Sequence, residues 1–249
     1  MLKTFIQENA WYVDTSKDTR KKLVSSFHAS YDKEIVAVIA SWLYNGCLGE
    51  DFVLEMTIEM LKPNPITYVM NPTYQWESDN GSFCGMMSNA NFVNLLKNIR
   101  DANLVNGGMQ QSFSSYMYTK RHKCKYVHDA FAYMFSGNTG FPTKSSKSTF
   151  FRYNYLYYLL YDLNIWDRNT IDFEKALLPC NDVIMQKAYQ FGLTKRLLRS
   201  DLRGTIELSN ISKQMFGIKD FYILYEFLNF ANDETFCCYD EWRLHRKKG

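Results

Sequence analysis

The sequence is poor in proline and glycine, with only five prolines and twelve glycines among 249 residues. Extended linkers and turn-rich all-β architectures are therefore disfavoured. The chain also lacks any apolar run near the roughly 18 residues that a membrane span needs. Its first residues, MLKTFIQENAW, contain no signal-peptide core. We therefore expect a cytoplasmic protein that does not associate with membranes.

The six cysteines have no spacing that suits a metal or a cluster. No Cys-x-x-Cys pair occurs, and the adjacent Cys237 and Cys238 have no further cysteine nearby, which argues against a zinc knuckle or a four-cysteine iron–sulfur loop. We expect these thiols to stay reduced, as thiols do in the cytoplasm. The common phosphate-loop, dinucleotide-loop, zinc-protease and serine-hydrolase signatures are also missing. The expected protein uses no metal and no organic cofactor.

What the sequence does contain is a series of helical periodicities. Over residues 32–46 apolar positions recur every three or four residues, with Asp32 placed to cap the helix start and Gly46 to end it. Similar patterns predict helices over residues 51–61, 91–101, 127–135, 149–163, 182–191, 206–216 and 219–230. Alternation typical of strands is rare, and no long repeat recurs. The predicted fold class is therefore mainly α, an all-α single domain spanning residues 1–249.

Positive charge is unevenly distributed along a chain whose net charge is only +3. Basic residues form three clusters: Lys120, Arg121, Lys123 and Lys125, followed at a distance by Lys144 and Lys147; Lys195, Arg196, Arg199 and Arg203; and Arg243, Arg246, Lys247 and Lys248 in the tail. Charge runs are usually solvated faces of a protein. Separate basic clusters on a nearly neutral chain nevertheless favour a phosphate backbone as partner.

Aromatic residues make up 16% of the sequence, and two interpretations of this excess stay open. The first is packing in the core, which is the usual place for tyrosines at helical spacing. The second is a pocket in which bases stack on rings. For such a pocket the candidates are Trp42, Tyr44 and Asn45, with the rings of Tyr153, Tyr155, Tyr157 and Tyr158 also available.

The segment from residue 144 to residue 193 carries the most specific pattern. Residues 179–188, PCNDVIMQKA, followed by Phe191-Gly-Leu193, resemble the P-V-D-x-x-V-x-R-x-A-x-x-L-G-L stretch of the helix-hairpin-helix DNA glycosylase superfamily. In that superfamily an aspartate opens a helix, faces the flipped nucleotide and is essential for breaking the glycosidic bond. The resemblance implies a two-lobed helical fold with the active-site cleft between the lobes.

Two branches of the superfamily resemble the chain most. One is the archaeal 8-oxoguanine DNA glycosylases, whose Ser-Lys-Thr element is similar to Ser146-Lys147-Ser148, with Lys147 placed 182 − 147 = 35 positions before Asp182. The other is an uncharacterised family of bacterial conserved proteins. Its motifs are similar to Phe5-Ile6, Phe27, Asp32, Glu34-Ile35, Ala37, Ala40, Tyr44, Arg152, Asn154, Leu156 (one position early) and Ile171-Asp172-Phe173.

The chain departs from the superfamily pattern at its central position. In the family register the aspartate falls on Asn181, and the only carboxylate is its neighbour Asp182. Either a one-residue shift lets Asp182 act, or the site uses an amide, or it is degenerate. Asn and Asp are also preferred as helix caps, which is a purely structural explanation of the pair. The glycine-rich hairpin is not visible, and residues 167–170 are its only candidate replacement.

The resemblance implies a monomeric DNA N-glycosylase that flips a modified base out of double-stranded DNA and excises it. Asp182 or Asn181 would stabilise the reacting sugar, and Lys147 could serve as an amine nucleophile with lyase activity. The residues expected to contact DNA are Lys144, Arg152, Lys195, Arg196, Lys120 and Arg121. The archaeal resemblance implies an oxidised purine as substrate. A pocket rich in Tyr, Trp and Asn would also suit a bulky hypermodified pyrimidine of phage DNA, and the protein would then serve antiviral defence. The alternatives are a catalytically degenerate DNA-binding protein of the same fold and a protein-interaction scaffold.

Overall fold

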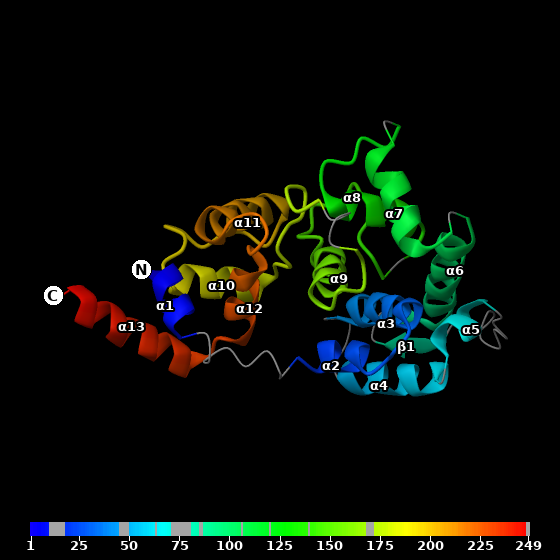
Figure 1. Ribbon diagram of the computed structural model, residues 1–249, viewed down its shortest axis with the longest axis horizontal. Coiled ribbons are helices and arrows are strands. Elements are labelled where there is room, and N and C mark those ends of the chain that lie inside the picture. The colour runs from blue at the N-terminus through cyan, green and yellow to red at the C-terminus, as the bar shows by residue number, and fades with distance from the viewer. Residues whose placement is uncertain are drawn as a thin grey trace. The chain divides into compact units, whose positions relative to one another are not determined.

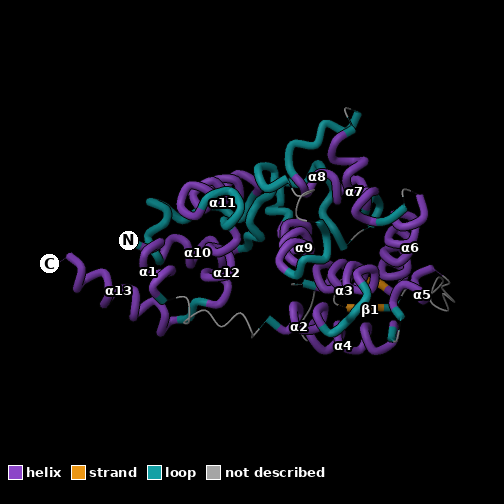
Figure 2. The backbone as a smooth tube through the Cα atoms, viewed as in Figure 1, coloured by secondary structure: helices purple, strands orange, loops and turns teal. Residues whose placement is uncertain are grey.

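The computed structural model describes residues 1–9, 18–44, 50–62, 64–70, 81–84, 87–105, 107–119, 121–138, 140–167 and 172–247. Helices dominate these residues, and the expected mainly α fold class is confirmed (Figure 1). The exception is an antiparallel hairpin of β1 (Ser82–Cys84) and β2 (Met87–Ser88), drawn in orange where visible in Figure 2. None of the helices in the described ranges is long and apolar enough to span a membrane.

The chain divides into two compact units. Unit 1 comprises Met1–Lys17, Lys147–Phe151 and Leu177–Gly249, and unit 2 comprises Asp18–Ser146 and Arg152–Ala176. The helices of unit 1 are α1 (Leu2–Glu8), α10 (Asp182–Gln190), α11 (Leu202–Phe216), α12 (Tyr222–Phe230) and α13 (Asp233–Lys247). Unit 2 holds α2 (Thr19–Ser25), α3 (Ser30–Leu43), α4 (Glu50–Leu61), α5 (Pro65–Met70), α6 (Asn89–Val105), α7 (Met109–Tyr118), α8 (Val127–Met134) and almost all of α9 (Phe151–Asp162).

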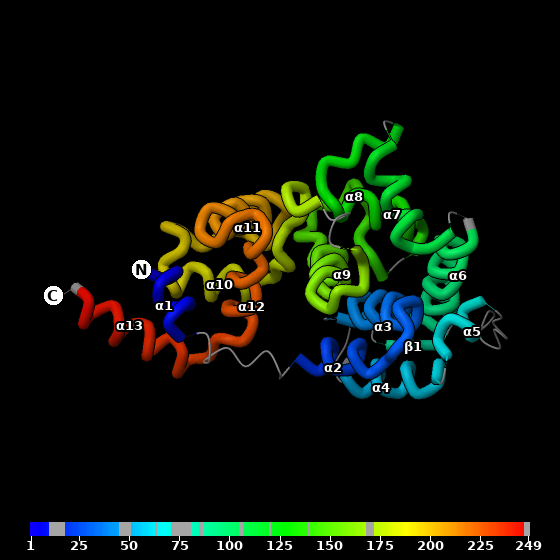
Figure 3. Tube along the Cα trace, in the orientation of Figure 1, coloured from blue at the N-terminus to red at the C-terminus, as the bar shows by residue number. Residues whose placement is uncertain are grey.

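In unit 1 the two ends of the chain pack together. Helix α1 contacts α13 (Figure 3), and the ring of Phe5 lies edge-on to Tyr239 and Trp242 at centroid distances of 5.1 and 5.5 Å. Phe191, directly after α10, packs edge-on against Phe227 of α12 at 4.9 Å. Edge-to-face ring pairs add stability beyond simple burial. These contacts hold α10 in a fixed place within unit 1.

The core of unit 2 is built from aromatic side chains on α7, α8 and α9. Phe113 lies 4.8 Å from Phe131 and 5.0 Å from Trp166, between ring centroids. Four of the five tyrosines of α9 are fully buried, namely Tyr153, Tyr155, Tyr157 and Tyr158, whereas Tyr161 near the end of the helix is half-buried. The packing interpretation of the tyrosine-rich helix is therefore the one that the structure supports.

Two expectations from the sequence need correction. Helix α3 begins at Ser30 with Ala29 as its cap residue, so Asp32 lies inside the first turn and its carboxylate accepts the backbone N–H of Ile66 instead. The expectation of reduced thiols is wrong for Cys84, which is disulfide-bonded. Because disulfides persist mainly in oxidising compartments, the cysteines no longer support a cytoplasmic location.

Unit 2 contains a carboxylic acid inside this aromatic core. Glu34 of α3 is 6% exposed and accepts a hydrogen bond from the indole N–H of Trp166. Burial raises the pKa of Glu34 to about 7, and the hydrogen bond from Trp166 opposes that rise. The buried His128 titrates in the other direction, because burial lowers its pKa to about 4. The pH dependence of folding in this range is thus a sum of two opposing contributions.

The glutamate contribution can be isolated with Glu34→Gln, which keeps an oxygen acceptor for Trp166. A raised acid pKa stabilises the fold fully below the unfolded value and loses that stabilisation as pH rises towards 7. The free energy of unfolding of the variant should therefore gain on wild type by roughly 3 kcal/mol between pH 4 and pH 8. Urea denaturation of both proteins across this range measures the difference, in which the His128 contribution cancels. A difference independent of pH would show that Glu34 does not titrate in the folded protein.

Candidate functional site

The start of α10 separates the roles of its two polar residues. Asn181 is the cap residue, and its side-chain oxygen accepts the backbone N–H of Ile184 at 3.0 Å. The segment just before Asn181, residues 177–180, is buried, and the backbone N–H of Leu178 donates to the hydroxyl of Ser209 at 2.9 Å. This anchored segment fixes the position of Asn181. Asp182, the first helical residue, is exposed, and its carboxylate has no hydrogen-bond or ion-pair partner within the described ranges.

Asp182 borders a hollow on the surface of unit 1. This Asp182 hollow has a volume of about 390 Å³ and is lined by Asp182, Met185, Gln186, Tyr189, Gln190, Leu197 and Leu198. The ring of Tyr189 is 48% exposed and the side chain of Leu197 is 56% exposed. The hollow therefore combines a free carboxylate, two amides and a half-exposed aromatic ring. Its volume lies in the range of small-molecule sites, roughly 300–1,000 Å³.

A second cavity of unit 1 adjoins the hollow. This arginine cavity, of about 340 Å³, is lined by Arg196, Leu198, Arg199, Asp201, Arg203, Gly204 and Glu207. Leu198 lines both depressions, so the two share a wall. Arg196 forms an ion pair with Glu207, with 3.0 Å between the nitrogen and the oxygen. Lys195, expected beside it as a DNA contact, is exposed but does not line the cavity.

Lys147 also belongs to unit 1. It lies four residues before α9 begins, in the short segment Lys147–Phe151, and its side chain is exposed. The expected nucleophile and the expected carboxylate, Asp182, are thus parts of the same compact unit. Among the described residues no three His, Cys, Asp or Glu side chains lie close enough together to hold a metal ion.

Trp42 does not line an open pocket, contrary to the expected base pocket. Its side chain is 0% exposed, and its indole N–H donates to the amide oxygen of Asn138 at 2.9 Å. A β-carbon on Gly140 would overlap the indole, so the loop around Gly140 packs directly on Trp42. The physical reason is that a large ring on the buried face of α3 is covered by the loop that follows α8. Its partner in the expected pocket, Asn45, lies outside the described residues.

The side chain of Arg152 contacts the backbone of Tyr44. The guanidinium of Arg152 donates to the carbonyl of Tyr44 at 3.0 Å and to the carbonyl of Gly140. The Tyr44 ring lies 4.7 Å from the ring of Tyr155 and 4.2 Å from the guanidinium carbon of Arg20. Both residues are half-buried. The guanidinium of Arg152 thus donates to carbonyl groups of the protein, and we no longer count it among the residues that contact DNA.

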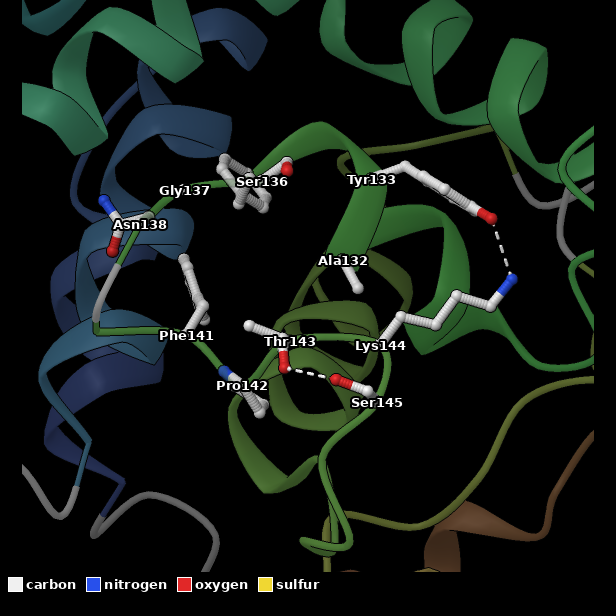
Figure 4. Close-up of a pocket in the computed structure, with 11 residues that line it drawn as sticks. Ala132, Tyr133, Ser136, Gly137, Asn138, Phe141, Pro142, Thr143, Lys144 and Ser145 are labelled. Atoms are coloured by element: carbon white, nitrogen blue, oxygen red, sulfur yellow. Dashed lines mark hydrogen bonds between the residues drawn. The ribbon is translucent and has the colours of Figure 1, made fainter.

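Lys144 lies in a third cavity, of about 400 Å³, between the end of α8 and the following loop (Figure 4). The amine of Lys144 points toward Tyr133, donating to its hydroxyl at 2.9 Å and to the carbonyl of His122 at 3.1 Å. The bond to Tyr133 raises the pKa of Lys144, so this amine stays charged. The structure thereby joins Lys144 to the loop that carries Arg121, which is exposed. Lys120 lies outside the described residues.

Several residues of the candidate site were not foreseen from the sequence. Tyr189, Gln186 and Gln190 occur on α10 at i, i+3 and i+4 spacing counted from Gln186, a pattern that places them on one face of a helix. This spacing in the sequence could have indicated that the three side chains share a surface. It could not have indicated that the surface borders the segment around Leu197, because that depends on tertiary packing.

The capping role of Asn181 leads to a stability prediction. Asn181→Ala removes the acceptor for Ile184 and should lower the free energy of unfolding by about 1 kcal/mol. Asn181→Asp is the matched control, because aspartate caps as well as asparagine does and should leave stability nearly unchanged. Urea denaturation at neutral pH measures both. Equal stability of the alanine variant and the wild type would show that the cap hydrogen bond is not formed in solution.

Comparison with protein-family models, with curated proteins and with solved structures finds no match for this chain. These comparisons therefore assign the chain to no family. Two features of the chain nevertheless indicate a function: the resemblance in residues 179–193 and the geometry of Asp182 and its surroundings.

Proposed function

We propose that the protein is a DNA N-glycosylase that excises a modified base from double-stranded DNA, with Asp182 as its catalytic carboxylate. The observation that carries the proposal is the free carboxylate of Asp182 at the start of α10, bordering the Asp182 hollow and next to the arginine cavity. Asn181, in the family register, uses its oxygen as a helix cap. This division of roles favours the one-residue shift over an amide-based site.

The chemistry needs a carboxylate without an internal partner. As the bond between C1′ and the base nitrogen breaks, its electron pair leaves with the base and positive charge builds on the sugar. A carboxylate at that point stabilises the charge, or takes a proton from the water whose oxygen bonds to C1′. The products are the free base and an abasic site. A carboxylate already held by an arginine or a lysine would be a weaker base for this step.

The Asp182 hollow also offers groups that receive a base. The target base must first leave the helical stack, at a cost of a few kcal/mol, and an aromatic surface offsets part of that cost. The half-exposed ring of Tyr189 supplies such a surface, in place of the buried Trp42. Gln186 and Gln190 supply amide donors and acceptors for the edge of the base.

The degenerate alternative has one observation in its favour, which is the asparagine at the family position. A protein of this fold that only binds DNA would need the arginine cavity but not Asp182. Activity of Asp182 variants therefore separates the two functions.

Asp182→Asn is expected to abolish excision while leaving DNA affinity intact or raised. The reason is that the variant keeps the shape of the side chain but removes its charge and its basicity. The measurement is the formation of abasic sites in duplexes that carry an oxidised purine or a hypermodified pyrimidine. Asn181→Ala serves as the comparison and should lose less activity, since it affects only the position of α10. Full activity of Asp182→Asn together with an inactive Asn181→Ala would assign the function to Asn181 and sink the proposed shift.

Lys147 decides between water and an amine as nucleophile. When a neutral amine attacks C1′, the bond from C1′ to the base breaks and its electron pair leaves with the base. The nitrogen then loses a proton and the sugar ring opens, with the C1′–O4′ electron pair going to the oxygen, which leaves a Schiff base between the amine and C1′. Borohydride reduces this C=N bond to a stable protein–DNA link. If Lys147 is the nucleophile, wild-type protein and Lys144→Ala should both be trapped and Lys147→Ala should not. Lys144 is the appropriate control because its amine is committed to Tyr133. Excision without trapping, with strands that break only in hot alkali, would assign the attack to water.

A further inference from the structure

The arginine cavity contains two guanidinium groups that form no ion pair with any of the described residues. Its two carboxylates are both engaged: Glu207 with Arg196, and Asp201 with the backbone N–H of Gly204 at 2.8 Å. The side chains of Arg199 and Arg203 are exposed and have no ion-pair partner in the part of the chain that the structure describes. Two free guanidinium groups on one cavity favour an anionic ligand.

The backbone that carries these arginines is tightly held. The hydroxyl of Thr194 donates to the carbonyl of Arg196 at 2.8 Å, and the backbone N–H of Asp201 donates to the carbonyl of Arg199 at 2.9 Å. A β-carbon on Gly204 would lie 2.1 Å from that same carbonyl oxygen. The loop therefore approaches the first turn of α11 more closely than any residue but glycine permits. Arginines on a fixed backbone lose less conformational freedom when they bind a ligand.

The cavity also has a defined neighbour. It shares Leu198 with the Asp182 hollow, and the ideal β-carbon position of Gly204 lies 3.4 Å from the terminal methyl of Met185, which lines that hollow. An anion held by Arg199 and Arg203 would thus lie directly beside the place where a base enters. In DNA the group found beside every base and sugar is a phosphodiester.

We infer that the arginine cavity binds one phosphodiester of the DNA backbone, adjacent to the nucleotide whose base enters the Asp182 hollow. This inference rests on the proposed function for its ligand, because a free phosphate has the same recognition chemistry. The planar guanidinium fork pairs with two phosphate oxygens at once, whereas a lysine ammonium offers only a point charge. Arg196 also lines the cavity and adds to its positive electrostatic potential, although its guanidinium remains paired with Glu207.

The test measures binding of an unmodified duplex, so that it does not depend on excision. The double variant Arg199→Ala, Arg203→Ala is compared with Lys3→Ala, Lys219→Ala, which removes the same charge from unit 1 at exposed positions outside the cavity. Fluorescence anisotropy at several salt concentrations gives the affinity and its salt dependence. The arginine variant should bind about tenfold more weakly or worse, with a salt slope shallower by about 0.9, because it neutralises one phosphate fewer. The lysine control should keep nearly the wild-type slope.

A charge-conserving variant tests the geometry. Arg199→Lys with Arg203→Lys should keep the salt slope but lose affinity severalfold, because the fork is gone while the charge remains. Full affinity of this variant would show a diffuse field instead of a built site and would overturn the inference. Titration with inorganic phosphate, followed by the side-chain NMR signals of Arg199 and Arg203, examines the other source. Saturation by phosphate, together with duplex binding that the alanine variant leaves unchanged, would assign the cavity to a free phosphate and overturn the inference as well.

Failure of the inference is distinguishable from failure of the proposed function. If the wild type excises no base but the arginine variant loses affinity and slope as expected, the phosphodiester site stands and the glycosylase activity falls. If the wild type excises a base and the arginine variant behaves like the lysine control, the glycosylase activity stands and the phosphodiester site falls. A wild type that does not bind duplex DNA at all overturns both.

Discussion

Burial of tyrosine and tryptophan in unit 2 depends on hydrogen bonds to their polar tips. A buried polar group without a partner costs roughly 1–3 kcal/mol, whereas one aromatic ring pair adds only about 0.5–1.5 kcal/mol. Trp42 donates to Asn138, Trp166 donates to Glu34, and the hydroxyl of Tyr157 accepts the backbone N–H of Asp172 at 3.1 Å. Each of these partners lies far from its ring in the sequence. The aromatic core therefore also determines where the loops after α8 and α9 run.

The same requirement explains the unusual carboxylic acid in the core. Glu34 accepts the indole N–H of a tryptophan that is surrounded by other rings, and burial raises its pKa to about 7. A protonated glutamate offers a donor as well as an acceptor, so it satisfies a polar tip at less cost than a buried charge does. Near neutral pH the folded state consequently exists in two protonation forms. This buried acid belongs to unit 2, and the proposed chemistry uses residues of unit 1.

Unit 1 uses its polar groups differently. Around α10 and α11 a few residues provide the hydrogen bonds and the ion pair that stabilise the fold: Asn181 caps α10, Asp201 caps α11, and Glu207 pairs with Arg196. Within the described ranges this leaves three side chains without an ion-pair partner on neighbouring depressions: the carboxylate of Asp182 and the guanidinium groups of Arg199 and Arg203. Opposite charges that face solvent without pairing with each other are available to a ligand that carries both kinds of partner. Duplex DNA with a flipped nucleotide is such a ligand, since its phosphates are anionic and its sugar becomes cationic as the base leaves.

Much of this could be predicted from the sequence, and the limit has a physical cause. Helices α3, α4, α6, α8, α9, α10, α11 and α12 were predicted because hydrophobic periodicity and caps are local, whereas α1, α2, α5, α7 and α13 were not predicted. Of these, α1 and α13 contact each other across the two chain ends, and a local pattern does not contain such a contact. The pairing of Asn181 with the start of α10 is likewise local, and so is the basic run at residues 195–203. Only the tertiary structure decided that Trp42 is buried while Tyr189 is half exposed, and that Arg196 is paired while Arg199 is not. Burial and ion pairing depend on residues that lie far away in the sequence or on another turn of the chain, and a pattern of residue types does not contain those distances.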